Sequence, residues 1–213
     1  MTITLSTWIF IANEASSQSG YFHGNDTIIN FENCNENKVP GGFFQTATGT
    51  DQLLNWIIAN DKGNKVVAQA AKNKGDFYNL LILKSPGYCN LQMTVKIKSI
   101  AGEEDMGGGL VGRFMDNKNY YILRCNPLEN NFRLYCVKNG NRKELKSVDC
   151  SVKPGEWFTL SAEMKGNRIS CYLNGRKLIE TTDDTFSKLG LTGFWTKADA
   201  QSYFDDLAIK PLN

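Results

Sequence analysis

The residues most suited to chemistry in this chain lie between positions 107 and 135, where arginines and tyrosines are interleaved with apolar residues. The segment begins with three glycines and reads GGGLVGRFMDNKNYYILRCN over residues 107–126. Tyrosine rings can stack on the C–H face of a pyranose, and a guanidinium group offers a planar fork of donors for hydroxyl groups or a carboxylate. We expect these side chains to share one exposed, ligand-binding surface. Its residues are Arg113, Tyr120, Arg124, Arg133 and Tyr135, with Trp195 and Lys197 at the rim.

This surface is predicted from the alternation of side chains along β-strands. If Leu110, Gly112 and Phe114 face the core, then Arg113 faces outward. The same alternation places the other arginines and tyrosines outward on the next two strands, while the glycines at 107–109 leave room for a ligand or a neighbouring backbone. A purely structural explanation is also open, because cross-strand pairs stabilise a sheet by roughly 0.2–1 kcal/mol each and arginine stems cover apolar surface.

Candidates for acid–base catalysis are few. A glycosidase needs two carboxylates that flank the scissile bond. The nearest acidic group, Glu103-Glu104-Asp105, lies in a glycine-flanked turn where solvation accounts for it, and the single histidine is His23. Catalytic residues therefore stay unassigned, and enzymatic activity stays open.

The six cysteines include no C-x-x-C pair, which argues against a zinc site or a redox motif of that type. We expect most of them to be buried thiols, although the even count also allows one or two disulfides.

The composition fits a folded protein that does not bind nucleic acid. Hydrophobic residues make up 41% of the 213 residues, charged residues 22%, and the net charge is +2 without any basic block. No stretch approaches the ~20 apolar residues of a membrane-spanning helix. Residues 1–25 are expected to form a loose arm or a trimmed signal remnant, because the apolar run at 5–12 is short and follows no Lys or Arg. An exported protein is expected.

The elements that would position these residues read as strands throughout. Apolar or alternating runs occur at 27–31, 53–60, 65–71, 78–84 and 89–99, and nine more follow between 109 and 210. The pairs Asn139-Gly140 and Asn174-Gly175 are typical of tight hairpins, and Gly166-Asn167 separates two further runs. About fourteen short strands without a helical period predict one all-β domain over 26–213, built as a two-sheet antiparallel jelly-roll sandwich.

Two segments resemble known families. PGEWFTLSAEMKGNRISCYLNGRKLIE (154–180) and GFWTKADAQSYFDDLAIK (193–210) resemble the laminin G and concanavalin A-like sandwich superfamily, and GGGLVGRFMDNKNYYILR resembles the bacterial 3-keto-disaccharide hydrolase domain family. The resemblance covers residues 27–211 and implies a concanavalin A-like fold. It also implies a structural Ca²⁺ held by Asp205 of the last strand, unless that acid is hydrogen-bonded to a loop or solvated.

For function, the resemblance implies three alternatives. The first is a carbohydrate-binding protein that uses the Arg/Tyr surface, the second is a glycoside hydrolase of the 3-keto-disaccharide hydrolase type, and the third is a laminin G-like protein-interaction module. The E-x-D-x-x-E motif of the superfamily's glycanases is missing. The acid expected after the family's tyrosine is also missing, since the segment reads Asn119-Tyr120-Tyr121-Ile122. Of the family's residues only Arg113 transfers, as a substrate contact.

Overall fold

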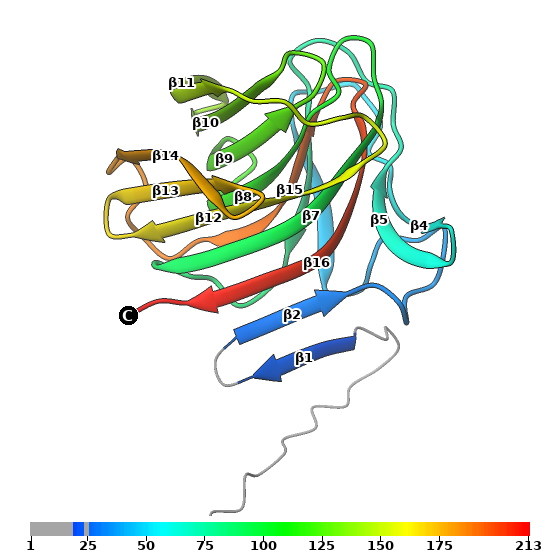
Figure 1. Ribbon diagram of the computed structural model, residues 1–213, viewed down its shortest axis with the longest axis horizontal. Coiled ribbons are helices and arrows are strands. Elements are labelled where there is room, and N and C mark those ends of the chain that lie inside the picture. Colours follow the sequence, from blue (N-terminus) through cyan, green and yellow to red (C-terminus); the bar gives the residue numbers. More distant parts are fainter. Residues whose placement is uncertain (1–18, 24–25) are drawn as a thin grey trace, which may run out of the picture.

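The computed structural model describes residues 19–23 and 26–213 as two stacked antiparallel β-sheets (Figure 1). Sixteen strands lie in this part of the chain, nine in one sheet and seven in the other. The described residues include no helix that could cross a membrane. The predicted all-β, two-sheet sandwich is confirmed.

The nine-stranded sheet is built around β16, the long last strand. Along its main path the order is β1 (Ser19–His23), β2 (Asp26–Asn30), β16 (Gln201–Pro211), β7 (Leu91–Ala101), β12 (Trp157–Lys165), β13 (Arg168–Leu173) and β14 (Arg176–Thr182). The hairpin of β4 (Trp56–Asp61) and β5 (Asn64–Gln69) joins the first half of β16 through β5.

The seven-stranded sheet carries the arginines and tyrosines singled out above. Its order is β11 (Asn141–Asp149), β10 (Asn131–Lys138), β9 (Asn119–Asn126), β8 (Gly108–Asp116), β15 (Leu191–Lys197), β6 (Tyr78–Leu83) and β3 (Phe43–Thr48). Strands β8 to β11 follow one another in sequence and in space, as expected for hairpin-linked strands.

The predicted hairpin turns occur where the sequence places them. Asn139-Gly140 joins β10 to β11 with φ values of 52° and 81°, and Asn174-Gly175 joins β13 to β14 with φ values of 48° and 78°. Positive φ at both central positions is what a two-residue hairpin turn requires, and Asn-Gly adopts it at low cost.

The main core lies between the sheets. Alternate residues of β7 and β12 face it, including Leu91, Met93 and Val95, all at most 1% exposed. The rings of Phe194 in one sheet and Phe204 in the other stack with centroids 4.8 Å apart. Gly108 allows this close approach, because a Cβ there would lie 2.7 Å from Ile97 Cγ2 in the opposite sheet.

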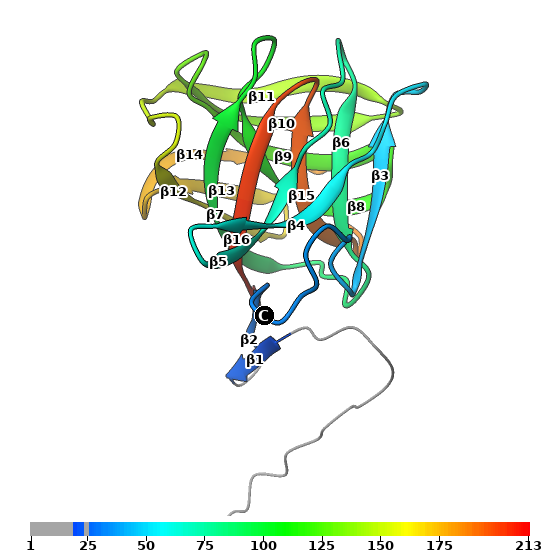
Figure 2. The same cartoon turned by 90° about the vertical axis from the view of Figure 1, so that its right-hand side faces the viewer.

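A second apolar cluster fills the other face of the seven-stranded sheet, and we call it the roll core. Its residues are Tyr78, Leu80, Ile82, Val111, Phe114, Tyr120, Ile122, Tyr135, Val137 and Trp195. The face is buried because the sheet curls: β3 and β6 stand nearly upright in Figure 2, whereas β10 and β11 cross the view. Thr48 of β3 donates to the Asn117 carbonyl at 2.5 Å, although β15 and β6 separate β3 from β8 in the sheet.

The predicted strand runs correspond to the observed strands except at two places. β3 was not predicted, and β1 lies within the expected loose arm. Residues 1–18 and 24–25 of that arm lie outside the described residues, as does the side chain of His23.

Candidate functional site

The predicted alternation is correct for four of the five surface residues. Tyr121, Leu123, Phe132 and Leu134 belong to the core between the sheets, so their neighbours on β9 and β10 point to the opposite face. Arg133 pairs with Arg124 in register, Arg124 pairs with Gly109, and Gly109 pairs with Trp195. Three of the predicted residues thus lie in one row across the sheet, on either side of a glycine.

The predicted exposure of this face is wrong for most of its residues. Tyr120 and Trp195 are fully buried, Arg124 is 1% exposed, and Tyr135 is 4% exposed. The cause is the curl of the sheet, which turns the face expected to meet solvent into the wall of the roll core. Only Arg133 and Lys197 keep substantial access to solvent, with side-chain exposures of 31% and 18%.

Arg113 does not lie on the predicted surface. A bulge between Gly112 and Asp116 interrupts the register of β8 with β9, and Arg113 within it has φ of 48°. Its Nε, Nη1 and Nη2 donate to the backbone carbonyls of Cys89, Phe186 and Gly166 at 3.0, 2.9 and 2.6 Å. The expected substrate contact is therefore corrected to a buried guanidinium that joins three loops. The bulge also turns Phe114 away from the expected core and into the roll core.

Tyr120 and Trp195 have packing roles in the roll core. The Tyr120 hydroxyl is 2.6 Å from Thr48 Oγ1, and burial raises the pKa of Tyr120. The Trp195 ring lies against Tyr78, with centroids 5.5 Å apart, and under the guanidinium of Arg142 at 5.9 Å. Arg142 also covers the rings of Tyr78 and Tyr135, so cation–π contacts close this part of the roll.

Arg124 is the centre of a polar group at the other end of the roll. Its Nη2 lies 2.8 Å from Asp105 Oδ2 and 3.3 Å from Glu129 Oε1. Its Nη1 donates to Asn131 Oδ1 at 3.3 Å and to the Tyr135 hydroxyl at 3.5 Å. We call this group the Arg124 cluster; its members are Asp105, Arg124, Glu129, Asn131, Arg133 and Tyr135.

Arg133 extends the Arg124 cluster to the solvent. Its Nη1 donates to Glu129 Oε2 at 3.2 Å and to the Tyr135 hydroxyl at 3.3 Å, and its Nε lies 3.3 Å from Glu144. Glu129 and Glu144 are 40% and 45% exposed. Charged donors and acceptors are thus held by one another at the surface of the protein.

The two carboxylates that pair with Arg124, those of Asp105 and Glu129, have pKa values shifted in opposite directions. Burial raises the pKa of Asp105 even though the charge of Arg124 and the Gly107 N–H favour its ionised form. Burial also acts to raise the pKa of Glu129. Its effect is outweighed by hydrogen bonds from Asn131 and Arg124 and by the charges of Arg124 and Arg133, which bring the pKa to about 2. One guanidinium therefore holds a deeply buried acid and an accessible carboxylate together.

The glycines before β8 accommodate protein groups. A Cβ at Gly107 would lie 2.8 Å from Arg124 Nε, so the absence of a side chain leaves room for the arginine. Arg124 Nε and Arg142 Nη1 are buried donors without a hydrogen-bond partner among the described residues. A buried donor of this kind calls for an acceptor, which water or a ligand oxygen can supply.

Sequence reasoning missed Glu129 and Asn131 and assigned Asp105 only to a solvated turn. Asp105 is 2% exposed, while Glu103 and Glu104 beside it are exposed as expected. A signal for Glu129 was present: it lies in the turn between β9 and β10, within five residues of an arginine on each strand.

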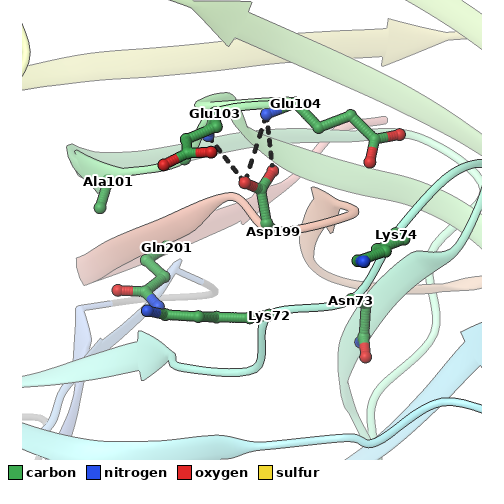
Figure 3. A pocket seen from close by; sticks show the side chains of 9 residues that line it. Lys72, Asn73, Lys74, Ala101, Glu103, Glu104, Asp199 and Gln201 are labelled. Carbon is green, nitrogen blue, oxygen red and sulfur yellow. Dashed lines mark hydrogen bonds between the residues drawn. The ribbon is translucent and has the colours of Figure 1, made fainter.

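A hollow of about 400 Å³ opens on the other side of the loop that carries Asp105 (Figure 3). Asp199 anchors this loop by accepting the backbone N–H groups of Glu103 at 2.7 Å and Asp105 at 3.0 Å. Burial acts to raise the pKa of Asp199, but these backbone donors outweigh it and lower the pKa. Most of the residues that line it have polar side chains: Lys72, Asn73, Lys74, Glu103, Glu104, Asp199 and Gln201, beside Ala101 and Gly102. The loop is therefore fixed by Asp199 on one side and by Arg124 on the other.

The side chain of Asp205 is hydrogen-bonded within the protein. Asn64 Nδ2 donates to one carboxylate oxygen at 2.9 Å, and the Asp206 N–H donates to the other at 2.8 Å. Each carboxylate oxygen thus accepts a hydrogen bond from the protein, which is the alternative that the sequence left open for this acid. Within residues 19–23 and 26–213, no group of three or more His, Cys, Asp or Glu side chains is arranged to hold a metal ion.

Comparisons with solved structures show the fold that this chain shares with known proteins. The carbohydrate-binding module CBM66 from Bacillus subtilis aligns with 21% identity and a TM-score of 0.62, over 76% of this chain and 92% of that one. Domain 4 of AbnA, a GH43 extracellular arabinanase from Geobacillus stearothermophilus in complex with arabinotriose, aligns with 15% identity and a TM-score of 0.56, over 92% and 93%. A glycoside hydrolase family 16 endo-glucanase from Bacteroides ovatus aligns with 11% identity and a TM-score of 0.56, over 79% of this chain and 94% of that one. The fold is that of the concanavalin A-like sandwiches.

The sequence itself places the chain more narrowly. Residues 44–210 match the 3-keto-alpha-glucoside-1,2-lyase-like domain family, and the chain belongs to that family. No curated protein matches it.

Proposed function

We propose that the protein binds a neutral carbohydrate at the open end of the roll, against the exposed side of the Arg124 cluster. Arg133 and Glu129 supply the direct contacts, and Arg124 and Asp105 hold them from below. The observation that carries the proposal is the chain of ion pairs Asp105–Arg124–Glu129–Arg133, which runs from a buried acid to a partly exposed guanidinium.

The chemistry of this group suits vicinal hydroxyl groups. A hydroxyl can accept from Arg133 and donate to Glu129 or Glu144, so each side chain satisfies a different part of the ligand. Positive and negative side chains are balanced here, which favours an uncharged sugar over a uronic acid. Lys197, paired with Asp76 at 3.1 Å, adds a further donor. The fold is shared with CBM66 and with a domain that holds arabinotriose, which supports a carbohydrate as ligand.

The test is a glycan array that contains neutral and acidic oligosaccharides, probed with the wild type, Arg133→Ala and Glu129→Gln. Arg168→Ala is the matched control, because Arg168 is exposed on β13 of the other sheet. We expect at least a tenfold loss of neutral-glycan binding in the first two variants and none in the control. Equal binding by all four proteins, or a wild type that binds no neutral glycan, would overturn the proposal, and binding of a protein partner with a silent array would favour a laminin G-like role.

A second candidate function is catalysis on a 3-keto-glucoside, as the family name suggests. The observation in its favour is that Asp105 and Glu129, on one guanidinium, have pKa values moved in opposite directions. Such a difference is typical of carboxyl pairs that divide acid and base roles. Release of the aglycone from a 3-keto-glucoside, lost in both Asp105→Asn and Glu129→Gln while the circular dichroism spectrum is unchanged, would establish it. A wild type without turnover would leave binding as the sole function.

Export remains part of the proposal, supported by the extracellular enzyme whose domain shares this fold. Fractionation of the producing cells, with the protein detected by antibody, tests it.

A further inference from the structure

Cys125 and Cys150 bring their sulfur atoms to within 3.4 Å of each other. A disulfide bond is about 2.05 Å long, so closing this gap requires a movement of only about 1.3 Å shared by two side chains. Cys125 is fully buried in β9, and Cys150, directly after β11, is half-buried. One of the two thiols is therefore reachable from solvent, and the other lies behind it.

The topology explains how residues from non-adjacent strands meet. Strand β10 lies between β9 and β11, and Asn126 and Asp149 pair with the same residue at its start, Asn131. Cys150 is one residue beyond this pair, and its N–H donates to the Asn130 carbonyl at 3.0 Å. The chain thus bends across the beginning of β10, and Cys150 reaches the core-facing side where Cys125 points.

We propose that Cys125 and Cys150 are a redox pair that closes into an intramolecular disulfide by exchange with a disulfide donor, such as oxidised glutathione. In the first step the Cys150 thiolate attacks one donor sulfur, a mixed disulfide forms, and one donor thiolate leaves. In the second step the Cys125 sulfur, having lost its proton, attacks Cys150 Sγ and displaces the second donor thiol. The two protein thiols are oxidised, and one donor disulfide is reduced to two thiols.

The order of the two steps follows from the surroundings of each sulfur. Contact with Cys125 lowers the pKa of Cys150, whereas that contact and then burial raise the pKa of Cys125. The thiolate is the attacking species, so Cys150, which is the more accessible and more acidic of the two, reacts first. Cys125 reacts second, because its target is the mixed disulfide that has formed on the neighbouring Cys150.

The bond would fix the turn that carries Glu129. The loop between the two cysteines contains this turn, in which Leu128 N–H donates to Asn126 Oδ1 at 2.9 Å. Glu129 projects from it onto Arg124 and Arg133. Oxidation would therefore restrict the motion of the carboxylate proposed to contact sugar; this consequence rests on the proposed function, whereas the disulfide itself does not.

The experiment treats the whole protein with oxidised glutathione and maps its peptides by mass spectrometry without reduction. We expect a cross-linked peptide pair containing Cys125 and Cys150, lighter by two hydrogen masses than the two thiol peptides, and a Tm raised by several degrees that dithiothreitol reverses. Cys89→Ser is the matched control, because Cys89 is an exposed thiol elsewhere on the surface, and it should oxidise like the wild type. Cys150→Ser should show neither the cross-link nor the rise in Tm.

Two outcomes would overturn the proposal. One is a stable glutathione adduct on Cys150 while Cys125 is alkylated after unfolding, and the other is a cross-link from Cys150 to a different cysteine. Because the mapping does not involve any glycan, a failed glycan array and a failed disulfide are separate results. If the disulfide forms and glycan binding by the oxidised and reduced proteins is equal, only the link to Glu129 is lost.

Discussion

Arg113 and Arg124 lie on the neighbouring strands β8 and β9, and each is 1% exposed, but one is hydrogen-bonded to the backbone and the other to side chains. All three hydrogen-bonded nitrogens of Arg113 donate to backbone carbonyls, whereas the hydrogen bonds of Arg124 go to side chains. Backbone carbonyls fix where loops lie, and side-chain carboxylates can exchange partners with a ligand. The first arginine therefore belongs to the architecture, and the second to the candidate site.

Removing the Arg113 side chain should destabilise the fold. In Arg113→Ala the buried space of the side chain is emptied and three backbone carbonyls in part-buried hydrogen bonds lose a charged donor. We expect the free energy of unfolding to fall by roughly 3–5 kcal/mol. Arg113→Lys should recover little of this, because an ammonium group cannot reproduce the three-pronged geometry. Urea denaturation of both variants checks the expectation, with Arg168→Ala staying within about 0.5 kcal/mol of the wild type. A loss below about 1 kcal/mol in Arg113→Ala would contradict the role assigned to it.

Glu129 should contribute to stability in a defined pH range. Its folded-state pKa of about 2 lies below the ordinary value of 4.5, so the folded protein prefers the ionised form. Its contribution is present above pH 4.5 and is lost as the pH falls toward about 2. Denaturation measured across this range should show the difference between wild type and Glu129→Gln shrinking as acid is added. A difference that stays constant with pH would show that the ion pairs of Glu129 do not stabilise the fold.

Two glycines in the seven-stranded sheet should respond differently to an added methyl group. A Cβ at Gly193 would collide with the Leu81 carbonyl and lie 2.8 Å from Ile82 Cα, which are backbone atoms of the adjacent strand. At Gly112 the Cβ would meet the flexible end of Met164, with Cε at 2.5 Å. We expect Gly193→Ala to cost about 3 kcal/mol or more and Gly112→Ala less than about 1.5 kcal/mol, both from chemical denaturation. The reverse order would contradict the packing described.

Chelation should leave the fold unchanged. Since Asn64 and the Asp206 N–H each donate to one oxygen of Asp205, the protein itself supplies hydrogen-bond donors to that acid. We expect the same Tm in EDTA and in millimolar Ca²⁺, measured by differential scanning calorimetry. A Tm that rises with Ca²⁺ and no longer does so in Asp205→Asn would restore the calcium site.

The alternation of side chains correctly predicted which residues of β9 and β10 share a face, because each is a regular strand between tight turns. It failed at Arg113 because the bulge there places an arginine, not a glycine, at positive φ, and alternation assumes an uninterrupted strand. The predicted exposure failed for a different reason. Alternation says which residues share a face, but whether that face is open depends on the curl of the whole sheet, set by contacts such as that of Thr48 with Asn117. Asp105 and Glu129 were overlooked because their partner, Arg124, was expected to face solvent.

The contact between Asn117 and β3 lies at the edge of the seven-stranded sheet. The last strand in a sheet presents unpaired N–H and C=O groups, on which a strand from another molecule can add. Here Asn117 Nδ2 donates to the Ala47 carbonyl at 2.7 Å, and Thr48 bonds back to the carbonyl of Asn117. The curl of the sheet therefore also covers part of this edge strand. A shortened β8–β9 turn would expose the edge to strand addition by another molecule, and so to aggregation.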